Sequence, residues 1–312
     1  MSRRVVVTVG TLALLVGCIG CAPELEDYWG DAATFEYPDQ PPESLDIVSY
    51  NVFLRPRTIS TKDATACRGE EIGELLANQD ADIVALQESW ERHAVSAMVD
   101  EAEVTLPYRV LSKPRAAFFR NTSGGLSILS KWPIEDVRTQ RYETCSGEDC
   151  LASKGILHAV IRVSETSRVH VVTTHLDSGG TGGDRQTRAE QIAELRDFIE
   201  EIDPRSGPIM LMGDFNVDGV AAGEEYEKLL ASLRANPDFE RGSSTVNCQT
   251  NVSCDTPAPP EQLDYVFTQS GESRMFRYQT THLPLATSAC GGEVNYLSDH
   301  RAVSATYDLF LR

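Results

Sequence analysis

Short apolar segments rich in Val and Ile recur from about residue 45 to the end of the chain, and stretches with helical periodicity lie between them. Apolar runs bounded by turn residues predict β-strands. In one helical stretch Ile192, Leu195 and Ile199 fall on a single face, with Glu and Arg opposite, which predicts an amphipathic helix. The clearest strands are LDIVSYNV, ADIVALQE, GGLSILSKWP, GILHAVIRV, RVHVVTTHL, PIMLMGDFN, LDYVFTQS and HRAVSATYDL, and the helices cover about residues 68–79, 89–101, 186–202 and 222–235.

Because predicted strands and helices interleave, the body of the protein is expected to be an α/β or α+β sheet domain. A chain of 312 residues with 41% hydrophobic content can bury a sizeable core. The sequence contains no internal repeat, and no linker divides it after residue 45. Residues 45–312 are therefore predicted to form one domain.

The first 44 residues differ in character from this body. Residues 1–20 combine a basic start with an apolar run that ends in small residues, which predicts a secretory signal. LVGC resembles a bacterial lipoprotein cleavage site and favours lipidation of Cys18, whereas an even number of remaining cysteines favours Cys21; an ordinary cleaved signal is the third alternative. Residues 21–44 are acidic and rich in Pro, so we expect a flexible tether. The protein is expected to be secreted, or lipid-anchored at the outer membrane or periplasmic face of a bacterial envelope.

The chain is strongly acidic. Its net charge of -19 becomes -21 once Arg3 and Arg4 leave with the signal, because residues 1–20 contain no acidic side chain. Nucleic-acid binding relies on Lys and Arg that neutralise phosphates, and the sequence has no cluster of these residues. The charge therefore argues against a nucleic-acid partner, although it is equally typical of a highly soluble secreted monomer.

Acidic, amide and imidazole side chains stand at the ends of the predicted strands. A sheet presents such side chains to a crevice, so residues far apart in the sequence are expected to converge. Carboxylate and amide oxygens suit a hard cation, Mg²⁺ first and Mn²⁺ or Co²⁺ as other candidates, and histidines beside it can transfer protons near neutral pH. A metal ion with neighbouring histidines is suited to the hydrolysis of a phosphoester. The strand-end residues are Asn51, Gln87, Glu88, Thr174, His175, Asp214, Asn216, Asp264, Asp299 and His300.

The segment PIMLMGDFNVDG contains two of these residues in close succession. The strand period of two places Asp214 and Asn216 on the same face, on either side of Phe215. Asp218 is interpreted as a turn residue, and His158 as an ordinary strand residue. Any single member of the set could equally be a solvated turn or cap, so the hypothesis rests on the set as a whole.

The motifs SYNV, ALQE, GLSILSKWPI, TTHLDS, GDFN, LDYVF and SDH follow one another in the order and at the kind of spacing found in the endonuclease/exonuclease/phosphatase superfamily. The resemblance covers about residues 45–312. It implies a deoxyribonuclease-like, four-layered α/β (α+β) sandwich in which two packed mixed β-sheets are flanked by helices. It also implies a Mg²⁺-dependent phosphodiesterase or phosphatase site at one end of the sandwich.

The resemblance implies that one part of this site binds the metal ion and activates water. Glu88 becomes the principal metal ligand, with Asn51 beside it and Asp299 at or near the metal. His300 becomes the general base that activates water. Asp264 is implied to hold His300 in one tautomer, as in other acid–imidazole pairs.

The resemblance also implies residues that contact the substrate. Asp214 and Asn216 bind the activated water or the phosphate, and His175 steadies the leaving group. Within the superfamily the sequence is most similar to bacterial sphingomyelinase C, because GLSILSKWPI is followed by the Cys-containing loop and strand of CSGEDCLASKGILHAVI. This closer likeness implies a phospholipid head group as substrate. It also implies a contact between Lys154 and the phosphate, with an exposed turn lysine as the alternative.

The sequence departs from that group in one segment. GESRMFRYQTTHLPLATSACGGEVNYL, where the secreted toxins carry a long aromatic hairpin, is short and contains no tryptophan, which argues against insertion into a bilayer. Two other functions stand beside the lipid hydrolase. An extracellular nuclease would use the same catalytic residues and is disfavoured by the charge. A non-catalytic binding module would be expected to lack catalytic positions, and all of them are present.

The cysteines beyond the signal are expected to form disulfides in an oxidising compartment. A zinc site is not expected, because no histidine is near and no Cys-x-x-Cys spacing occurs. Spacing alone does not determine the connectivity. The pairs that suit local bridges are Cys145 with Cys150 and Cys248 with Cys254, which leave Cys67 for Cys290.

Overall fold

The computed structural model describes residues 35–56, 64–112, 122–221, 223–236, 243–252, 259–269, 275–283, 285–291 and 295–310. The predicted signal, both candidate lipidation sites and residues 21–34 of the predicted tether lie outside these ranges. Within them, no helix is long and apolar enough to cross a membrane.

Strands and helices alternate along most of the domain, and strands dominate its last part. The elements are β1 (Ser44–Leu54), α1 (Thr65–Asn78), β2 (Ile83–Ser89), α2 (Arg92–Ala102), β3 (Tyr108–Leu111), β4 (Ser127–Ser130), β5 (Ile134–Arg141), η1 (Gly147–Leu151), β6 (Gly155–Arg162), β7 (Arg168–His175), α3 (Gly182–Glu200), β8 (Ile209–Asp214), α4 (Glu224–Leu233), η2 (Cys248–Thr250), β9 (Asp264–Thr268), β10 (Met275–Leu283), β11 (Ala286–Thr287), β12 (Asn295–Tyr296) and β13 (Ala302–Leu309).

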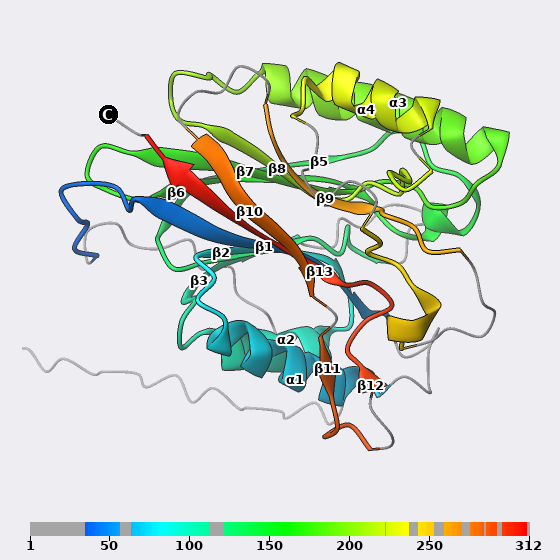
Figure 1. Ribbon diagram of the computed structural model, residues 1–312, viewed down its shortest axis with the longest axis horizontal. Helices are drawn as coiled ribbons and strands as arrows, with labels where there is room; N and C mark the ends of the chain where they lie inside the picture. The colour runs from blue at the N-terminus through cyan, green and yellow to red at the C-terminus, as the bar shows by residue number, and fades with distance from the viewer. Residues whose placement is uncertain are drawn as a thin grey trace, which may run out of the picture.

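Two β-sheets pack against each other at the centre of the molecule (Figure 1). One has the strand order β10-β13-β1-β2-β4-β3 and the other the order β5-β6-β7-β8-β9, while β11 and β12 form a separate small sheet. β1 pairs with β2 in parallel, as β7 does with β8, and the remaining neighbours in both large sheets are antiparallel. Both large sheets are therefore mixed.

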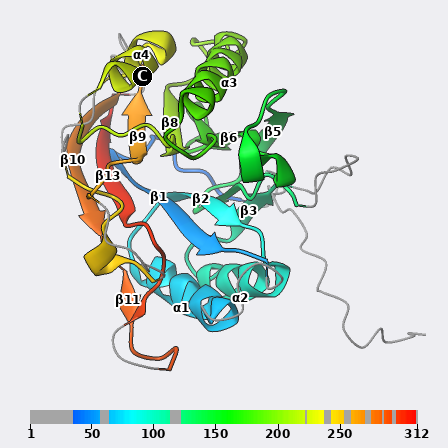
Figure 2. The ribbon, with the colours of Figure 1, turned by 90° about the vertical axis from the view of Figure 1, so that its right-hand side faces the viewer.

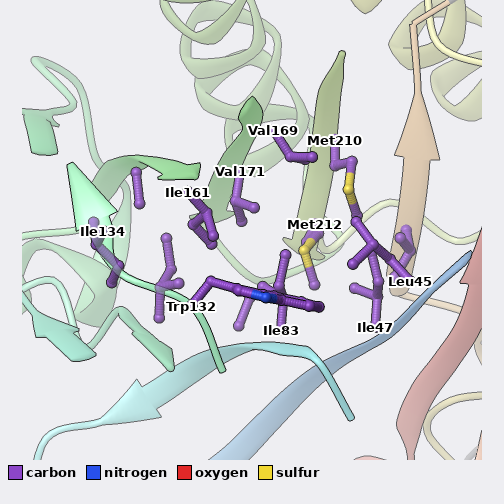
Figure 3. Close-up of a cluster of buried hydrophobic side chains, with 14 of the residues drawn as sticks. Leu45, Ile47, Ile83, Trp132, Ile134, Ile161, Val169, Val171, Met210 and Met212 are labelled. Carbon is purple, nitrogen blue, oxygen red and sulfur yellow. The ribbon is translucent and has the colours of Figure 1, made fainter. Parts of the chain in front are cut away.

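Helices complete the sandwich on both sides (Figures 1 and 2). Between the sheets, Ile47 and Ile83 of one sheet and Val171 and Met212 of the other belong to a buried cluster that also includes Trp132 (Figure 3). α1 and α2 cover the outer face of the six-stranded sheet through a second cluster, and α3 and α4 cover the five-stranded sheet through a third. Apolar burial in all three clusters stabilises this arrangement. The predicted four-layered, deoxyribonuclease-like sandwich is confirmed.

Capping side chains determine where two helices begin. α3 starts four residues before its predicted start, because Thr181 and Asp184 form a capping box. α2 starts three residues after its predicted start, because the side chain of Glu91 accepts from the amide of Ala94. β3, β5 and β10 were not among the predicted strands. β5 is an edge strand that buries only Ile134 fully, so its sequence lacks the apolar run that marks inner strands.

Residues 35–43, part of the predicted tether, lie against the domain. Phe35 packs on the cluster between the sheets, and its ring centroid lies 5.9 Å from that of Tyr108. The amide of Glu165 donates to the carbonyl of Pro38 over 3.2 Å. This part of the N-terminal segment therefore contributes to the packing of the sandwich.

Two disulfides join pairs of described cysteines, and both match the predicted pairs. One bridge, Cys145–Cys150, closes a short loop before β6, and the other, Cys67–Cys290, ties α1 to the segment between β11 and β12. Cys248 is also disulfide-bonded. Its predicted partner Cys254 lies outside the described residues.

Candidate active site

The strand-end residues converge at one end of the sandwich, where β1, β2, β7 and β8 end and β9 and β13 begin. In the register of the five-stranded sheet, Asp214 lies between His175 on one side and Asp264 on the other. From the facing sheet, Nδ2 of Asn51 donates to Oδ2 of Asp214 over 3.0 Å. The site is therefore built from both sheets.

His300 and Asp264 form a buried pair at this end. Nδ1 of His300 lies 2.7 Å from Oδ2 of Asp264, so the carboxylate accepts from Nδ1–H. Nε2 lies 3.8 Å from Oδ2 of Asp214 and 4.0 Å from Oδ1 of Asp299. Burial acts to lower the pKa of His300, but Asp264, Asp214 and Asp299 together raise it well above its usual value. The imidazole is thus held in one orientation with a strong affinity for a proton.

Glu88 lies in surroundings that disfavour its charge. Its Oε1 accepts from Nδ2 of Asn51 over 3.2 Å, whereas Oε2 is buried and has no hydrogen-bond partner among the residues that the structure describes. Burial, with the carboxylate of Asp299 nearby, raises the pKa of Glu88 to about 7, and burial also raises the pKa of Asp299. Two carboxylates of raised pKa, one with an unpaired oxygen, fit a bound divalent cation, which would compensate both charges.

A second set of acidic and imidazole groups lies nearby. Ligand atoms of Asp214, Asp264 and His300 come within 4.8 Å of one another. In that set, Oδ2 of Asp264 and Nδ1 of His300 are already bonded to each other. A cation site that includes Glu88 is therefore favoured over one formed by these three residues alone.

Asn216 reaches the site in a different way from the one expected. β8 ends at Asp214 and Asn216 has a φ of 50°, so strand alternation does not extend past Phe215. The main-chain N–H of Asn216 donates to Oδ1 of Asp214, and its Nδ2 donates to the carbonyl of Leu176. The predicted shared strand face is wrong, and a turn closed by the Asp214 side chain takes its place.

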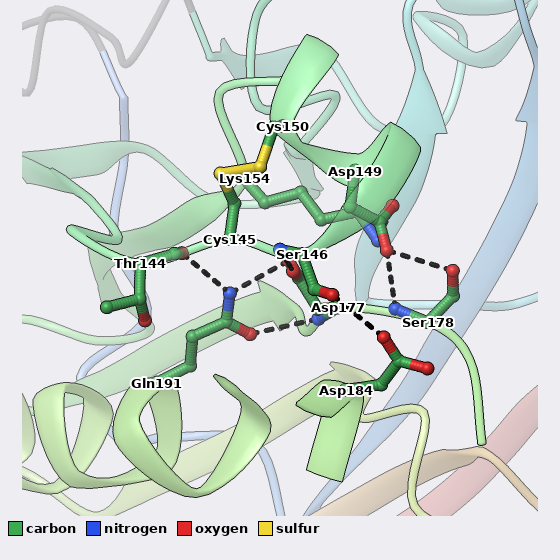
Figure 4. Close-up of a disulfide and its surroundings, with 10 residues drawn as sticks. All are labelled: Thr144, Cys145, Ser146, Asp149, Cys150, Lys154, Asp177, Ser178, Asp184 and Gln191. Carbon is green, nitrogen blue, oxygen red and sulfur yellow. Dashed lines mark hydrogen bonds and ion pairs between the residues drawn. A yellow bond between two sulfur atoms is a disulfide. The ribbon is translucent and has the colours of Figure 1, made fainter. Parts of the chain in front are cut away.

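Lys154 fixes the tautomer of His175. An ammonium group can only donate, so the 3.0 Å contact between Nζ and Nε2 of His175 leaves the imidazole proton on Nδ1. Burial and Lys154 lower the pKa of His175 to about 3. Nζ also donates to the carbonyl of Leu176 over 2.9 Å. It lies 2.7 Å from Oδ1 of Asp149, beside the Cys145–Cys150 loop (Figure 4). In this arrangement no proton of Lys154 is left for a phosphate.

Some residues of the site were not found from the sequence. The ring of Trp90 lies beside that of His175, tilted by 32° with the centroids 6.2 Å apart. Gly125 has a φ of 66°, and a Cβ at this position would lie 2.3 Å from Nε1 of Trp90. Only glycine therefore fits at Gly125. The hydroxyl of Ser298 donates to the carbonyl of Asn51 over 2.6 Å. The sequence offered one indication of Trp90 and Ser298, their position next to predicted motifs: Trp90 follows ALQES, and Ser298 is the first residue of SDH.

The backbone is strained at three positions of this end. Phe53, Glu88 and Asn216 have φ values of 51°, 56° and 50°, in the left-handed region that non-glycine residues rarely adopt. Each costs on the order of 1–3 kcal/mol and persists only where the surroundings enforce it. Such strain is typical of functional sites, because it aims side chains that a regular strand would point elsewhere.

The fold and this constellation define a class of protein. A model of the Endonuclease/Exonuclease/phosphatase family matches residues 48–300. The chain therefore belongs to this family.

Individual members of the family that are similar to this chain include phospholipases and sphingomyelinases of bacteria. A phospholipase C of Staphylococcus aureus is 28% identical over 244 residues, which cover 72% of this chain and 73% of that protein. The crystal structure of sphingomyelinase C from Streptomyces griseocarneus superimposes with a TM-score of 0.72 at 25% identity, over 84% of this chain and 99% of that one. A double mutant of the beta toxin from Staphylococcus aureus with bound magnesium ions has a TM-score of 0.70 at 23% identity, over 84% of this chain and 99% of that one, and shows likeness of fold.

Proposed function

We propose that the protein is a Mg²⁺-dependent phosphodiesterase that hydrolyses the head-group phosphodiester of a phospholipid, with sphingomyelin as the first candidate. The observation that carries the proposal is the bonded pair of His300 and Asp264, with Nε2 of His300 3.8 Å from Asp214 and the unpaired Oε2 of Glu88 in the same site. The similarity to a phospholipase C and to a sphingomyelinase C supports a lipid substrate. The magnesium of the beta toxin supports Mg²⁺ as the cation, with Mn²⁺ or Co²⁺ as alternatives.

In this proposal the metal-binding residues and the base act together on water. Glu88, Asn51 and Asp299 hold the cation, which when bound neutralises charge on the phosphoryl oxygens. A bound cation would compensate the carboxylates that raise the pKa of His300. The neutral ring would then take a proton from the attacking water at Nε2, and Asp264 would stabilise the imidazolium that results. Because His300 is fixed by a buried hydrogen bond, this transfer needs no reorientation of the ring.

The residues proposed to contact the phosphate are Asp214, Asn216 and His175, and they hold the attacking water and the leaving oxygen in line. Asp214 orients the water, and Asn216 fixes the carboxylate of Asp214 and contacts the phosphate. Neutral His175 contacts the phosphate and steadies the leaving oxygen through Nδ1–H, which has no partner among the described residues, because Nε2 accepts from Lys154. Lys154 acts through His175, whose tautomer it holds.

Export is part of the same proposal. The predicted signal in residues 1–20, with a lipid at Cys18 or Cys21, delivers the enzyme to the outside of the cell or to its envelope. The Cys67–Cys290 and Cys145–Cys150 bridges agree with such an oxidising location.

A substrate screen tests the function. Sphingomyelin, phosphatidylcholine, DNA, RNA and inositol phosphates are compared with Mg²⁺ and with EDTA, for the wild type, His300→Ala, Asp214→Ala and the control His93→Ala. We expect Mg²⁺-dependent release of choline phosphate from sphingomyelin that EDTA and both site variants abolish and the control retains. Nicking of DNA without lipid hydrolysis would establish a nuclease instead, and no hydrolysis of any substrate by folded protein would contradict an enzymatic function.

A further inference from the structure

We propose that Arg68 is a positioning residue that sets the two halves of the metal-binding region relative to each other, an inference that rests on the proposed function. Its side chain, in α1, is fully enclosed at 1% exposure. Nη1 donates to the carbonyl of Leu297 over 2.7 Å and Nη2 to the carbonyl of Phe53 over 2.7 Å. Nη1 also donates to the carbonyl of Val52 over 3.2 Å. One guanidinium thus joins two separate chain segments.

These two segments carry the proposed ligands of the cation. Val52 and Phe53 follow Asn51 near the end of β1, whereas Leu297 lies two residues before Asp299. The segments come from opposite ends of the domain sequence, and no ladder hydrogen bond of the sheet joins Leu297 to β1 in the described register. The distance between the two ligand-bearing segments therefore depends on groups such as Arg68.

On the β1 side, Arg68 acts on the orientation of an amide. Phe53, whose carbonyl it holds, has a φ of 51°, and the N–H of Phe53 donates to Oδ1 of Asn51 over 3.1 Å. With Oδ1 fixed in this way, Nδ2 of Asn51 donates to Glu88 and to Asp214. A shift of the Phe53 peptide would therefore rotate the Asn51 amide away from both carboxylates.

On the other side, the carbonyl of Leu297 begins a short hydrogen-bonded turn. The hydroxyl of Ser298 donates to the carbonyl of Asn51 over 2.6 Å, and the main-chain N–H of His300 donates to the same hydroxyl over 3.1 Å. Ser298 Oγ also lies 3.2 Å from Oδ1 of Asp299. Arg68 donates to the first carbonyl of this turn, that of Leu297. It therefore fixes the positions of Asp299 and His300 relative to β1.

A guanidinium suits this task better than an ammonium. A buried charge is costly unless its donors are satisfied, and the planar fork of Arg68 places donors on two nitrogens at fixed angles. A lysine at this position keeps the charge but offers one nitrogen, which cannot reach carbonyls of both segments in the same geometry. Arg68→Lys therefore separates the positioning role from the charge.

The same helix has other contacts to the C-terminal segment, and one of them provides a matched control. The hydroxyl of Thr287 donates to Oε2 of Glu71 over 2.5 Å, and Cys67 is bridged to Cys290. Both links attach α1 to residues 287–290 rather than to the turn at Leu297. Thr287→Ala therefore weakens the attachment of the segment without loosening the site.

The test compares wild type, Arg68→Lys and Thr287→Ala, each well below its melting temperature. Calorimetry gives the Mg²⁺ dissociation constant, and kinetics at saturating Mg²⁺ give kcat and KM on the best substrate of the screen. We expect Arg68→Lys to bind Mg²⁺ at least tenfold more weakly and to lose at least tenfold in kcat, with KM changed less than threefold. Thr287→Ala is expected to stay within twofold of wild type in all three quantities.

A purely structural role predicts a different result. Arg68→Lys would then lower the melting temperature but keep its Mg²⁺ affinity and kcat within twofold of wild type, and that outcome overturns the proposal, as would wild type that binds no Mg²⁺. If wild type hydrolyses no phosphodiester, the proposed function fails and the calorimetric comparison alone decides the role of Arg68.

A measurement on the wild type decides the matter if Arg68→Lys does not fold. Hydrogen exchange at the guanidinium of Arg68 is followed by NMR as Mg²⁺ is added, with Arg188 as the reference, because Arg188 is equally buried and is held by Glu225. We expect Mg²⁺ to slow exchange at Arg68 at least threefold and to leave Arg188 unchanged. No change at Arg68, or an equal change at both residues, overturns the proposal.

Discussion

Nδ1 of His300 lies 2.7 Å from Oδ2 of Asp264 although 36 positions separate the two residues in the chain. The carboxylate fixes which nitrogen of the ring carries a proton, and it stabilises the ring when Nε2 gains a second one. We expect Asp264→Asn to lower kcat by roughly 10³-fold or more, because an amide can bind the ring in the wrong tautomer. Kinetics at saturating Mg²⁺, with the exposed Asp203→Asn as control, measure the loss. A kcat within fivefold of wild type would show that the pair is not catalytic.

Glu88 is expected to oppose stability in the absence of a cation. Its pKa is about 7 in the folded protein and 4.5 in the unfolded chain. The folded state therefore holds the proton more tightly, and stability falls as the pH rises from 4.5 to 7. Glu88→Gln should therefore raise the free energy of unfolding at pH 8 in EDTA by up to about 3 kcal/mol. The same variant should lose the stabilisation that Mg²⁺ gives to wild type. Urea unfolding with and without Mg²⁺ checks both expectations, and a variant less stable than wild type in EDTA would contradict them.

His158 and His170 form a buried imidazole pair, and the ring of His158 contacts that of Phe198 in α3. The hydroxyl of Ser206 donates to the carbonyl of Asp203, so Nε2 of His170 must donate to that hydroxyl. Nδ1 of His170 then accepts from Nε2 of His158 over 2.9 Å. Nδ1 of His158 is buried and has no partner in the described part of the chain. Protonation at that atom would create an unpaired donor next to a second imidazole, and burial and His170 accordingly lower the pKa of His158 to about 4.

This pair predicts a pH dependence of stability. The unfolded histidine binds its proton near pH 6.5 and the folded one only near pH 4, so stability falls as the pH drops from 6.5 to 4, by up to about 3 kcal/mol from this residue. We expect His158→Gln to flatten this acid limb, since the amide does not titrate. Chemical unfolding at several pH values measures the slope, with His93→Gln as the control. An unchanged slope in His158→Gln would assign the acid limb to other groups.

The two disulfides should differ in their effect on stability. Cys67–Cys290 joins residues 223 positions apart and Cys145–Cys150 residues 5 apart. Loop-closure entropy predicts losses of about 5 and about 2 kcal/mol when each pair is replaced by serine. Urea unfolding of the two double variants gives the comparison, and a larger loss for the short loop would mean that it holds native contacts such as that between Asp149 and Lys154.

The apolar runs of most strands predicted a sheet domain, and the resemblance to a known family implied that its two sheets form a sandwich. β5 escaped prediction because it is exposed and polar along most of its length. Likewise, the site residues could be found because each motif is local, with the polar residue directly after the apolar run, as at Asp214, or directly before it, as at Asp264 and His300.

Residues that act through long-range contacts could not be predicted in this way. Arg68 lies in the charged segment ACRGEE and resembles an ordinary surface arginine of a helix, although its contacts to Leu297 and Phe53 bury it completely. Asn216 shows the limit of periodicity, because the turn at Asp214 ends the strand before the pattern does. In both cases partners distant in the chain override the local pattern.

The hydrogen bond from Asn51 to Asp214 spans the two sheets, since one residue lies in β1 and the other in β8. Neither half of the sandwich holds a complete set of reactive groups by itself. A chain that has folded only one sheet, during export or after partial unfolding, therefore cannot catalyse the reaction. Hydrolysis would thus report on closure of the whole domain, and a loss of docking between the layers would switch the reaction off before either layer unfolds.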